Sequence, residues 1–88
     1  MKRREDFILR QVAGTWVVLP VGKAAEAWNG MLTLNESGVL LWNALEKDTK
    51  PQALVDALLA EYQVAEDQAR ADVDAFLEVL TRAGCLEE

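Results

Sequence analysis

The sequence predicts an α+β fold in which a small antiparallel sheet is followed by helices. Before Asn35 the apolar runs are short and rich in β-branched and aromatic residues, which is typical of strands. After Asn35 the apolar residues recur at intervals of three and four, which is typical of amphipathic helices. Strands followed by helices indicate a domain whose helices gather on one side of the sheet.

Three strands are expected, at residues 7–13, 15–19 and 31–34. Gly14 separates the first two and can adopt the positive φ of a tight turn, so these strands should form an antiparallel hairpin. A loop of about ten residues that contains Trp28 should follow, because Pro20 and Gly22 interrupt the apolar pattern. A sheet of three strands has two edges, and one of them is a candidate docking site.

Three helices should follow the sheet. The first spans residues 36–46 with Asn35 as its N-cap, and the second lies between the loops at 48–51 and 63–65 with Thr49 as its cap. The third spans residues 66–83 and ends at Gly84, a residue typical of helix C-termini. Its buried stripe consists of Ala69, Val73, Phe76, Leu77 and Leu80.

Length and composition favour one domain covering residues 1–88. The chain is 51% hydrophobic, too apolar for intrinsic disorder, and its net charge is −6. Residues 45–88 carry eleven acidic and four basic groups, a balance that disfavours nucleic acid as a partner because phosphates repel carboxylates. No apolar run is long enough to span a membrane, and no signal segment is evident. With Cys85 as its single cysteine, the chain is expected to be cytoplasmic.

The residues of common catalytic arrangements are missing. The sequence has no histidine and no glycine-rich phosphate loop, so neither an enzyme nor a cofactor-binding protein is expected. The acidic residues Asp67, Asp72, Asp74 and Glu78 fit no calcium-binding loop and offer no soft ligand. They are interpreted as a solvated acidic face, so no metal is expected. Ser37, which precedes an apolar helix, leaves an acyl-carrier-like protein as an alternative, although carrier proteins are all-helical.

The third helix has an apolar stripe wider than one core contact requires. On one flank of the buried stripe lie Ala75, Val79 and Ala83, with Asp72 as the only polar residue. This flank either packs against the sheet of the same chain or forms one wall of a groove. A groove between it and a free sheet edge would suit an extended peptide, which binds such edges as an added strand.

The sequence resembles the coenzyme PQQ synthesis protein D family along nearly its whole length. The resemblance rests on Phe7-x-Leu9-Arg10-x-Val12-Ala13-Gly14, then Val17-Val18-x-Pro20-Val21-Gly22, and above all Asn29-Gly30-Met31-x-x-Leu34-Asn35-x-x-Gly38-x-x-Leu41-Trp42. It implies a winged-helix-like fold, with a three-stranded antiparallel sheet followed by a three-helix bundle. It also implies a non-catalytic peptide chaperone that binds the leader segment of a ribosomally made precursor peptide. The chaperone presents that segment to a modifying enzyme, typically of the radical S-adenosylmethionine type.

By this resemblance the leader adds as a strand to the third strand, with the last helix as the second wall. The implied peptide-binding residues are Met31, Leu32, Thr33, Leu34, Asp72, Ala75, Phe76, Val79 and Ala83. Within the strand, alternation places Leu32 and Leu34 toward the core and Met31 and Thr33 on the other face. Three alternatives stay open: a winged-helix nucleic-acid binder, an acyl-carrier-like protein, and a homodimer formed through the same apolar surface.

Overall fold

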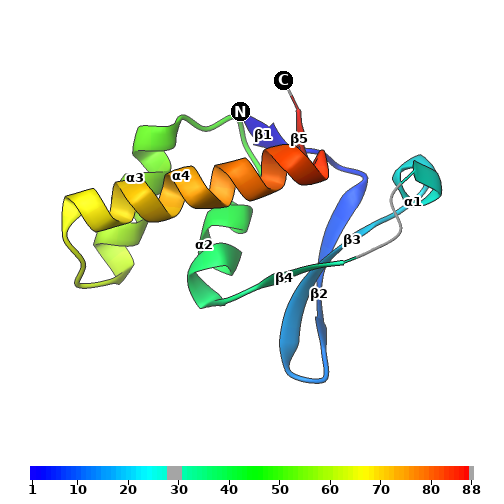
Figure 1. The fold of residues 1–88 in the computed structure, drawn as a ribbon, viewed down its shortest axis with the longest axis horizontal. Coiled ribbons are helices and arrows are strands. Elements are labelled where there is room, and N and C mark those ends of the chain that lie inside the picture. The colour runs from blue at the N-terminus through cyan, green and yellow to red at the C-terminus, as the bar shows by residue number, and fades with distance from the viewer. Residues whose placement is uncertain (28–30, 88) are drawn as a thin grey trace.

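The computed structural model describes residues 1–27 and 31–87. It begins with β1 (Lys2–Arg3), β2 (Phe7–Val12), β3 (Thr15–Pro20), α1 (Lys23–Ala27) and β4 (Leu32–Leu34). The helices α2 (Glu36–Ala44), α3 (Pro51–Glu61) and α4 (Glu66–Ala83) follow, and β5 (Leu86–Glu87) ends the described chain. The α+β prediction, a small antiparallel sheet followed by three helices, is confirmed (Figure 1).

The main sheet has the order β2-β3-β4, and both pairs are antiparallel. The hairpin between β2 and β3 turns at Ala13 and Gly14, whose φ angles of 52° and 81° are both positive, as a two-residue turn between twisted strands requires. Val12 therefore pairs with Thr15. The turn predicted at Gly14 is confirmed, and the hairpin projects from the body of the molecule (Figure 1).

Three short elements were not expected from the sequence. The predicted loop after β3 contains the five-residue helix α1, and the prediction for Trp28 lies outside the described residues. The strands β1 and β5 pair antiparallel and bring the first and last described residues together on one side of the molecule, at the top of Figure 1. Two-residue strands carry too little pattern to be recognised in a sequence, because alternation becomes visible only over four or more residues.

The boundaries of the three main helices correct the prediction at two places. The first helix ends at Ala44, not at residue 46, and its N-cap is Asn35 as expected, with Oδ1 accepting from the Gly38 N–H at 2.8 Å. Thr49 does not cap the second helix, because its hydroxyl donates to the carbonyls of Ala44 and Lys47 at 2.9 and 2.7 Å. It closes the end of α2 instead.

The third predicted helix matches α4 at both ends. Gly84 follows it with a φ of 74°, in the left-handed conformation that glycine adopts without strain. No side chain caps its first turn at Ala65. Four members of its predicted core stripe are buried (Ala69, Val73, Leu77 and Leu80), while Phe76 is half-buried at the edge of the core.

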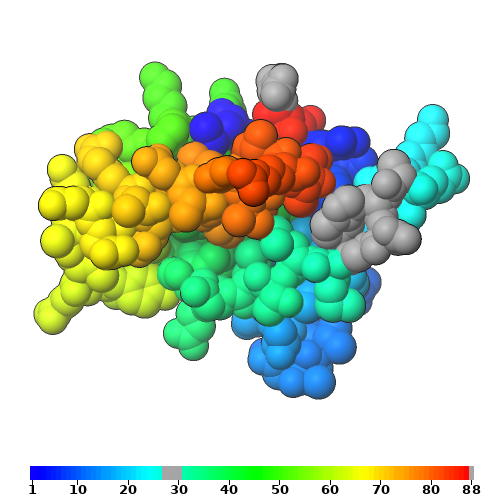
Figure 2. All heavy atoms as spheres, viewed as in Figure 1, coloured from blue at the N-terminus to red at the C-terminus, as the bar shows by residue number. Residues whose placement is uncertain are grey.

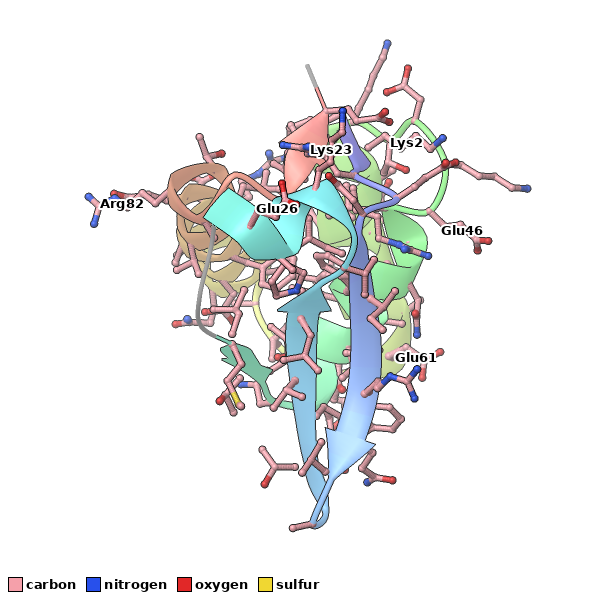
Figure 3. The ribbon with its side chains drawn as sticks, turned by 90° about the vertical axis from the view of Figure 1, so that its right-hand side faces the viewer. Lys2, Lys23, Glu26, Glu46, Glu61 and Arg82 are labelled. Carbon is pink, nitrogen blue, oxygen red and sulfur yellow. The ribbon has the colours of Figure 1, made fainter. Side chains whose placement is uncertain are left out.

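The core lies between the sheet and the helices. Trp42 is 1% exposed and is its largest side chain, and the Arg3 guanidinium carbon lies 5.3 Å from the centre of its ring. Further buried side chains come from every layer of the fold: Phe7, Val18, Leu34, Leu41, Leu45, Leu54, Val55, Leu58, Ala69, Val73, Leu77, Leu80 and Cys85. A view from the side shows the sheet below α4 and the helices behind it (Figure 3).

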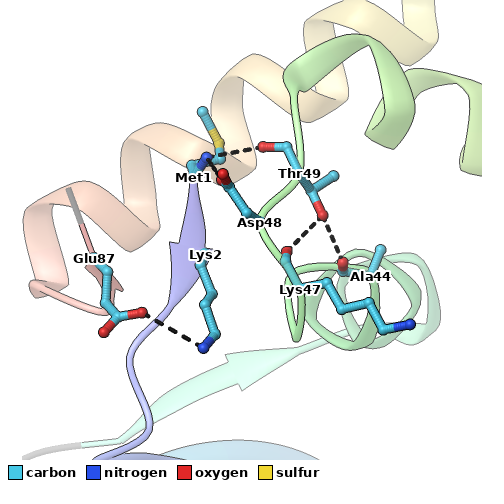
Figure 4. A network of polar contacts seen from close by, with 7 residues as sticks. All are labelled: Met1, Lys2, Ala44, Lys47, Asp48, Thr49 and Glu87. Carbon is cyan, nitrogen blue, oxygen red and sulfur yellow. Dashed lines mark hydrogen bonds and ion pairs between the residues drawn. The ribbon is translucent and has the colours of Figure 1, made fainter.

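A polar network fastens the ends of the chain to the α2–α3 loop (Figure 4). The Met1 ammonium lies 2.6 Å from the Asp48 carboxylate and donates to the Thr49 carbonyl at 3.0 Å. The hydrogen bond from this ammonium lowers the pKa of Asp48 below its usual value. The next residue, Lys2 of β1, forms an ion pair with Glu87 of β5 at 3.9 Å. Because Thr49 also donates to the Ala44 carbonyl, this network lies at the C-terminal end of α2.

Candidate functional site

The outer edge of β4 is open, because β4 pairs only with β3 among the strands that the structure describes. The pairing of Val12 with Thr15 closes a two-residue turn and is therefore a hydrogen-bonded pair, from which the two types of pair alternate along the ladder. The Val21 N–H donating to the Asp6 carbonyl at 2.8 Å fits this alternation. The backbone N–H and C=O of Val17 are therefore directed to β2. Those of Thr33, its partner in β4, point away from β3 toward the open edge.

The side chains of β4 alternate as predicted. Leu34 is buried at 8% exposure and Leu32 packs against the core, while Thr33 is exposed. Met31 lies just outside β4, which begins at Leu32, and its side chain is 60% exposed. The predicted third strand is thus one residue too long, yet its assignment of Leu32 and Leu34 to the core face is confirmed.

The junction between β4 and α2 is held tightly. Asn35 continues the extended backbone of β4, with φ −84° and ψ −178°, before the helix begins. A side chain at Gly38 would meet Asn35 Oδ1 at 3.2 Å and Leu34 Cβ at 3.3 Å, closer than most real Cβ contacts. The absence of a side chain at Gly38 lets the first turn of α2 pack directly against the end of β4.

The predicted flank of α4 is largely open. Val79 is 44% exposed and Ala75 is exposed, whereas Phe76 and Ala83 are half-buried against the core. Away from the core α4 is polar, and there Arg82 pairs with Glu78 at 2.7 Å. In Figure 2 the atoms of α4, coloured orange, lie directly above those of β4 and the start of α2 on the same face of the molecule. The sheet of the same chain therefore does not cover the apolar flank of α4.

Two adjoining cavities lie where β4 ends. The larger, of about 390 Å³, is lined by the start of α2, the end of α3 and one residue of α4: Asn35, Glu36, Ser37, Leu58, Tyr62, Val64 and Asp72. The smaller, of about 230 Å³, shares Asn35, Ser37, Leu58 and Asp72 with it and reaches Ala75 and Phe76. Together they form a depression along α4, which we call the head cavity. It continues the line of the β4 edge beyond Leu34.

The structure brings together only part of the predicted site. Asp72, Ala75 and Phe76 line the head cavity, whereas Val79, Ala83 and the residues of β4 do not. The sequence reading missed Glu36, Leu58, Tyr62 and Val64. Tyr62 and Val64 are 37% and 38% exposed, and two large apolar residues at the end of a helix were the available signal.

Other candidate groups have structural surroundings. The Ser37 hydroxyl donates to Asn35 Oδ1 at 3.0 Å and so belongs to the helix cap. Cys85 is buried, and burial raises the pKa of its thiol to about 11, which keeps it protonated at neutral pH. Among residues 1–27 and 31–87, no group of three or more histidine, cysteine or acidic side chains is arranged to hold a metal ion.

No helix within the described part of the chain combines the length and apolar character needed to cross a membrane. The longest, α4, is 18 residues long but carries charged side chains along its outer faces.

Comparisons with known proteins agree with this arrangement. TbiB1, solved in complex with the TbiA(β) leader peptide, is 26% identical with a TM-score of 0.77, covering 99% of this chain and 95% of that chain. A lasso peptide synthetase B1, solved with its leader peptide, shares the fold at 22% identity and a TM-score of 0.75, with 99% and 96% covered. No curated protein sequence gave a significant match. The family model for coenzyme PQQ synthesis protein D (PqqD) matches residues 15–86, so the chain belongs to the PqqD family.

Proposed function

We propose that this protein is a non-catalytic peptide chaperone that binds the leader segment of a ribosomally made precursor peptide. The observation that carries the proposal is the pairing of an open sheet edge at β4 with an open apolar flank on α4. An edge supplies unpaired backbone groups and an apolar wall supplies side-chain contacts, which together suit an extended peptide. TbiB1, which has the same fold, was solved in complex with a leader peptide, and this supports the proposal.

In the proposed complex the leader adds to β4 as a further strand. The outward N–H and C=O of Thr33 pair with its backbone, and the exposed Met31 and Thr33 side chains contact its near face. On the other side, the wall is formed by Asp72, Ala75, Phe76, Val79 and Ala83. Leu32 and Leu34 support the edge from the core face.

The bound precursor is then presented to a modifying enzyme. Holding the precursor on the chaperone raises the local concentration of its core segment at the enzyme's active site, which is how tethering accelerates a second encounter. We propose an enzyme of the radical S-adenosylmethionine type as that partner, as the resemblance to the PqqD family implies. The chaperone itself is proposed to need no cofactor, to act in the cytoplasm, and to form one domain over residues 1–88.

The competing functions have less support. A nucleic-acid binder would present its longest helix to phosphates, but α4 carries five acidic and two basic residues. An acyl carrier would need a free serine at the attachment point, and the Ser37 hydroxyl is engaged in the cap of α2. The acidic α4 would repel nucleic acid, and the engaged Ser37 hydroxyl is not free to carry an attached group.

An amide NMR titration with the precursor peptides encoded beside the gene tests the proposal. Peptide-induced shifts are expected in residues 31–35 and 72–83, because these segments form the two walls of the proposed groove. Concentration-dependent broadening of the same residues in the free protein, with no peptide-induced shifts, would instead identify the surface as a dimer interface and overturn the proposal.

A further inference from the structure

We propose that the head cavity selects precursors carrying an apolar side chain with a lysine or arginine within two residues of it. This inference rests on the proposed function and specifies which sequences the groove accepts. Its basis is the combination of an apolar floor, an acidic rim and a position at the end of the β4 edge.

The floor of the cavity fits one apolar side chain. Leu58 is buried at 3% exposure and forms the base, while Tyr62 and Val64 stand beside it at 37% and 38% exposure. A volume of about 390 Å³ exceeds that of any single side chain, so part of the space stays open toward the rim. Apolar surface left exposed around a cavity is typical of a binding site.

The rim of the cavity carries two carboxylates and no cation. Glu36 makes no ion pair within the described part of the chain, and Asp72 accepts a hydrogen bond from the neutral amide of Gln68 at 2.9 Å. The positive N-terminal end of α2 and the negative C-terminal end of α3 both meet at the cavity, and their partial charges of about half an elementary charge nearly cancel. The net field of the rim is therefore negative, which complements a cation.

The position of the cavity places it in the path of an added strand. The extended backbone of β4 continues through Asn35, which itself lines both parts of the cavity. A peptide paired with Thr33 therefore leaves the edge beside Asn35 and enters the cavity within the next few residues, since each strand residue advances about 3.3 Å. An anchor on this segment fixes the register, which an edge of only three residues leaves poorly specified.

A displayed library of random peptides tests the inference, because selection from it does not require the precursor to be identified first. Selection on the intact protein is expected to enrich an apolar residue with lysine or arginine within two positions. Selected peptides without that pairing, yet still bound through β4 and α4 in an amide NMR titration, would overturn the inference and leave the proposed function standing. A library that yields no binder to this groove would count against both.

Isosteric variants then locate the selection on the rim. Asp72→Asn keeps an acceptor for Gln68, and Glu36→Gln keeps its length, so neither variant should disturb the fold. For a selected peptide, each should weaken binding about threefold and the pair about tenfold, which is the range of exposed ion pairs that act independently. The same peptide with its lysine replaced by glutamine should lose this sensitivity.

The control variant is Asp74→Asn, which removes an equal charge from the polar flank of the same helix. It should change the dissociation constant of neither peptide beyond the small effect of the overall charge. Equal weakening by Asp74→Asn and Asp72→Asn would mean that net charge, not the cavity, attracts the cation, and the inference would be wrong.

Discussion

The two outer edges of the β2-β3-β4 sheet differ in length and in what lies next to them. The edge of β2 is six residues long, and its last three residues, Arg10, Gln11 and Val12, are exposed on a hairpin that projects from the molecule. The edge of β4 is three residues long and lies on the same face as the apolar flank of α4, beside the head cavity.

Unpaired backbone groups along a sheet edge do not by themselves make a docking site. By length, β2 offers more outward-pointing groups than β4, among them those of Gln11, whose partner Trp16 directs its own groups to β4. What β2 lacks along its projecting half is a second wall to exclude water from the added strand. In β-strand addition the backbone supplies affinity and adjacent pockets supply specificity, so the shorter edge is the better site.

Proline substitution at matched positions should separate the two edges most strongly. Thr33→Pro removes an outward N–H of β4 without removing a bond to β3, and edge strands tolerate proline at such positions. Peptide affinity should fall about 10- to 100-fold, because one hydrogen bond is lost and the ring obstructs the incoming strand. Isothermal titration calorimetry measures this change.

Gln11→Pro is the control, since its N–H points outward from β2 in the same way. Its peptide affinity should equal that of the unmodified protein. A loss of affinity in Gln11→Pro that matches the loss in Thr33→Pro would place the ligand on the wrong edge.

A charge placed on the apolar wall should have the next largest effect. Val79→Asp puts a carboxylate where the ligand's side chains should pack. Peptide affinity is expected to fall about tenfold, because the bound peptide would partly remove this carboxylate from water. Val79 is 44% exposed, so the fold should be unaffected. Fluorescence anisotropy with a labelled peptide gives the affinity.

Val12→Asp is the matched control, because Val12 is 51% exposed at the tip of the projecting hairpin. The same substitution there should leave binding unchanged. Normal binding by Val79→Asp would contradict the assignment of α4 as the second wall.

Loosening the end of β4 should have a smaller effect on binding and a measurable effect on stability. Asn35→Ala removes the cap of α2, including the hydrogen bond from Gly38 N–H, and should lower the free energy of unfolding by about 1 kcal/mol. Urea denaturation measures this loss. Asn35→Asp, which retains a capping oxygen, should restore most of the stability, and failure to do so would show that the cap is not the cause.

Cys85 is buried in the core, and near neutral pH the ionisation of its thiol should have no effect on the free energy of unfolding. Because burial raises its folded-state pKa to about 11 from 9.0, the folded protein holds the thiol proton where the unfolded chain has lost it. The contribution of Cys85 to stability should therefore be constant below pH 9 and should fall as the pH rises toward 11. Denaturation of Cys85→Ala, which lacks the titrating group, should show a shallower fall over that interval.

The sequence predicted those parts of the fold that have a long or chemically distinctive pattern. The helical periodicity over the 18 residues of α4, the glycine at its end and the Asn35 cap all appear in the structure. The misassigned cap at Thr49 has a physical reason: a threonine between two helices can serve the end of the first as readily as the start of the second. Helix α1 and the β1–β5 pair were too short to recognise.

The candidate site was only partly predictable for a different reason. The periodicity of α4 identifies Val79 and Ala75 as an apolar flank, because residues on one helix face are fixed by helix geometry. The head cavity joins Glu36, Leu58 and Tyr62 from separate elements, and their proximity depends on how α2, α3 and α4 pack. No local pattern encodes that packing.

Hydrogen exchange at the Thr33 amide, measured with and without a bound precursor peptide, shows whether the leader adds to β4 as a strand. Strand addition at β4 predicts that the Thr33 N–H exchanges readily in the free protein and becomes protected on binding, while the Gln11 N–H of β2 is unchanged. Protection at Gln11, or peptide binding that leaves Thr33 exchanging at its free rate, would contradict it.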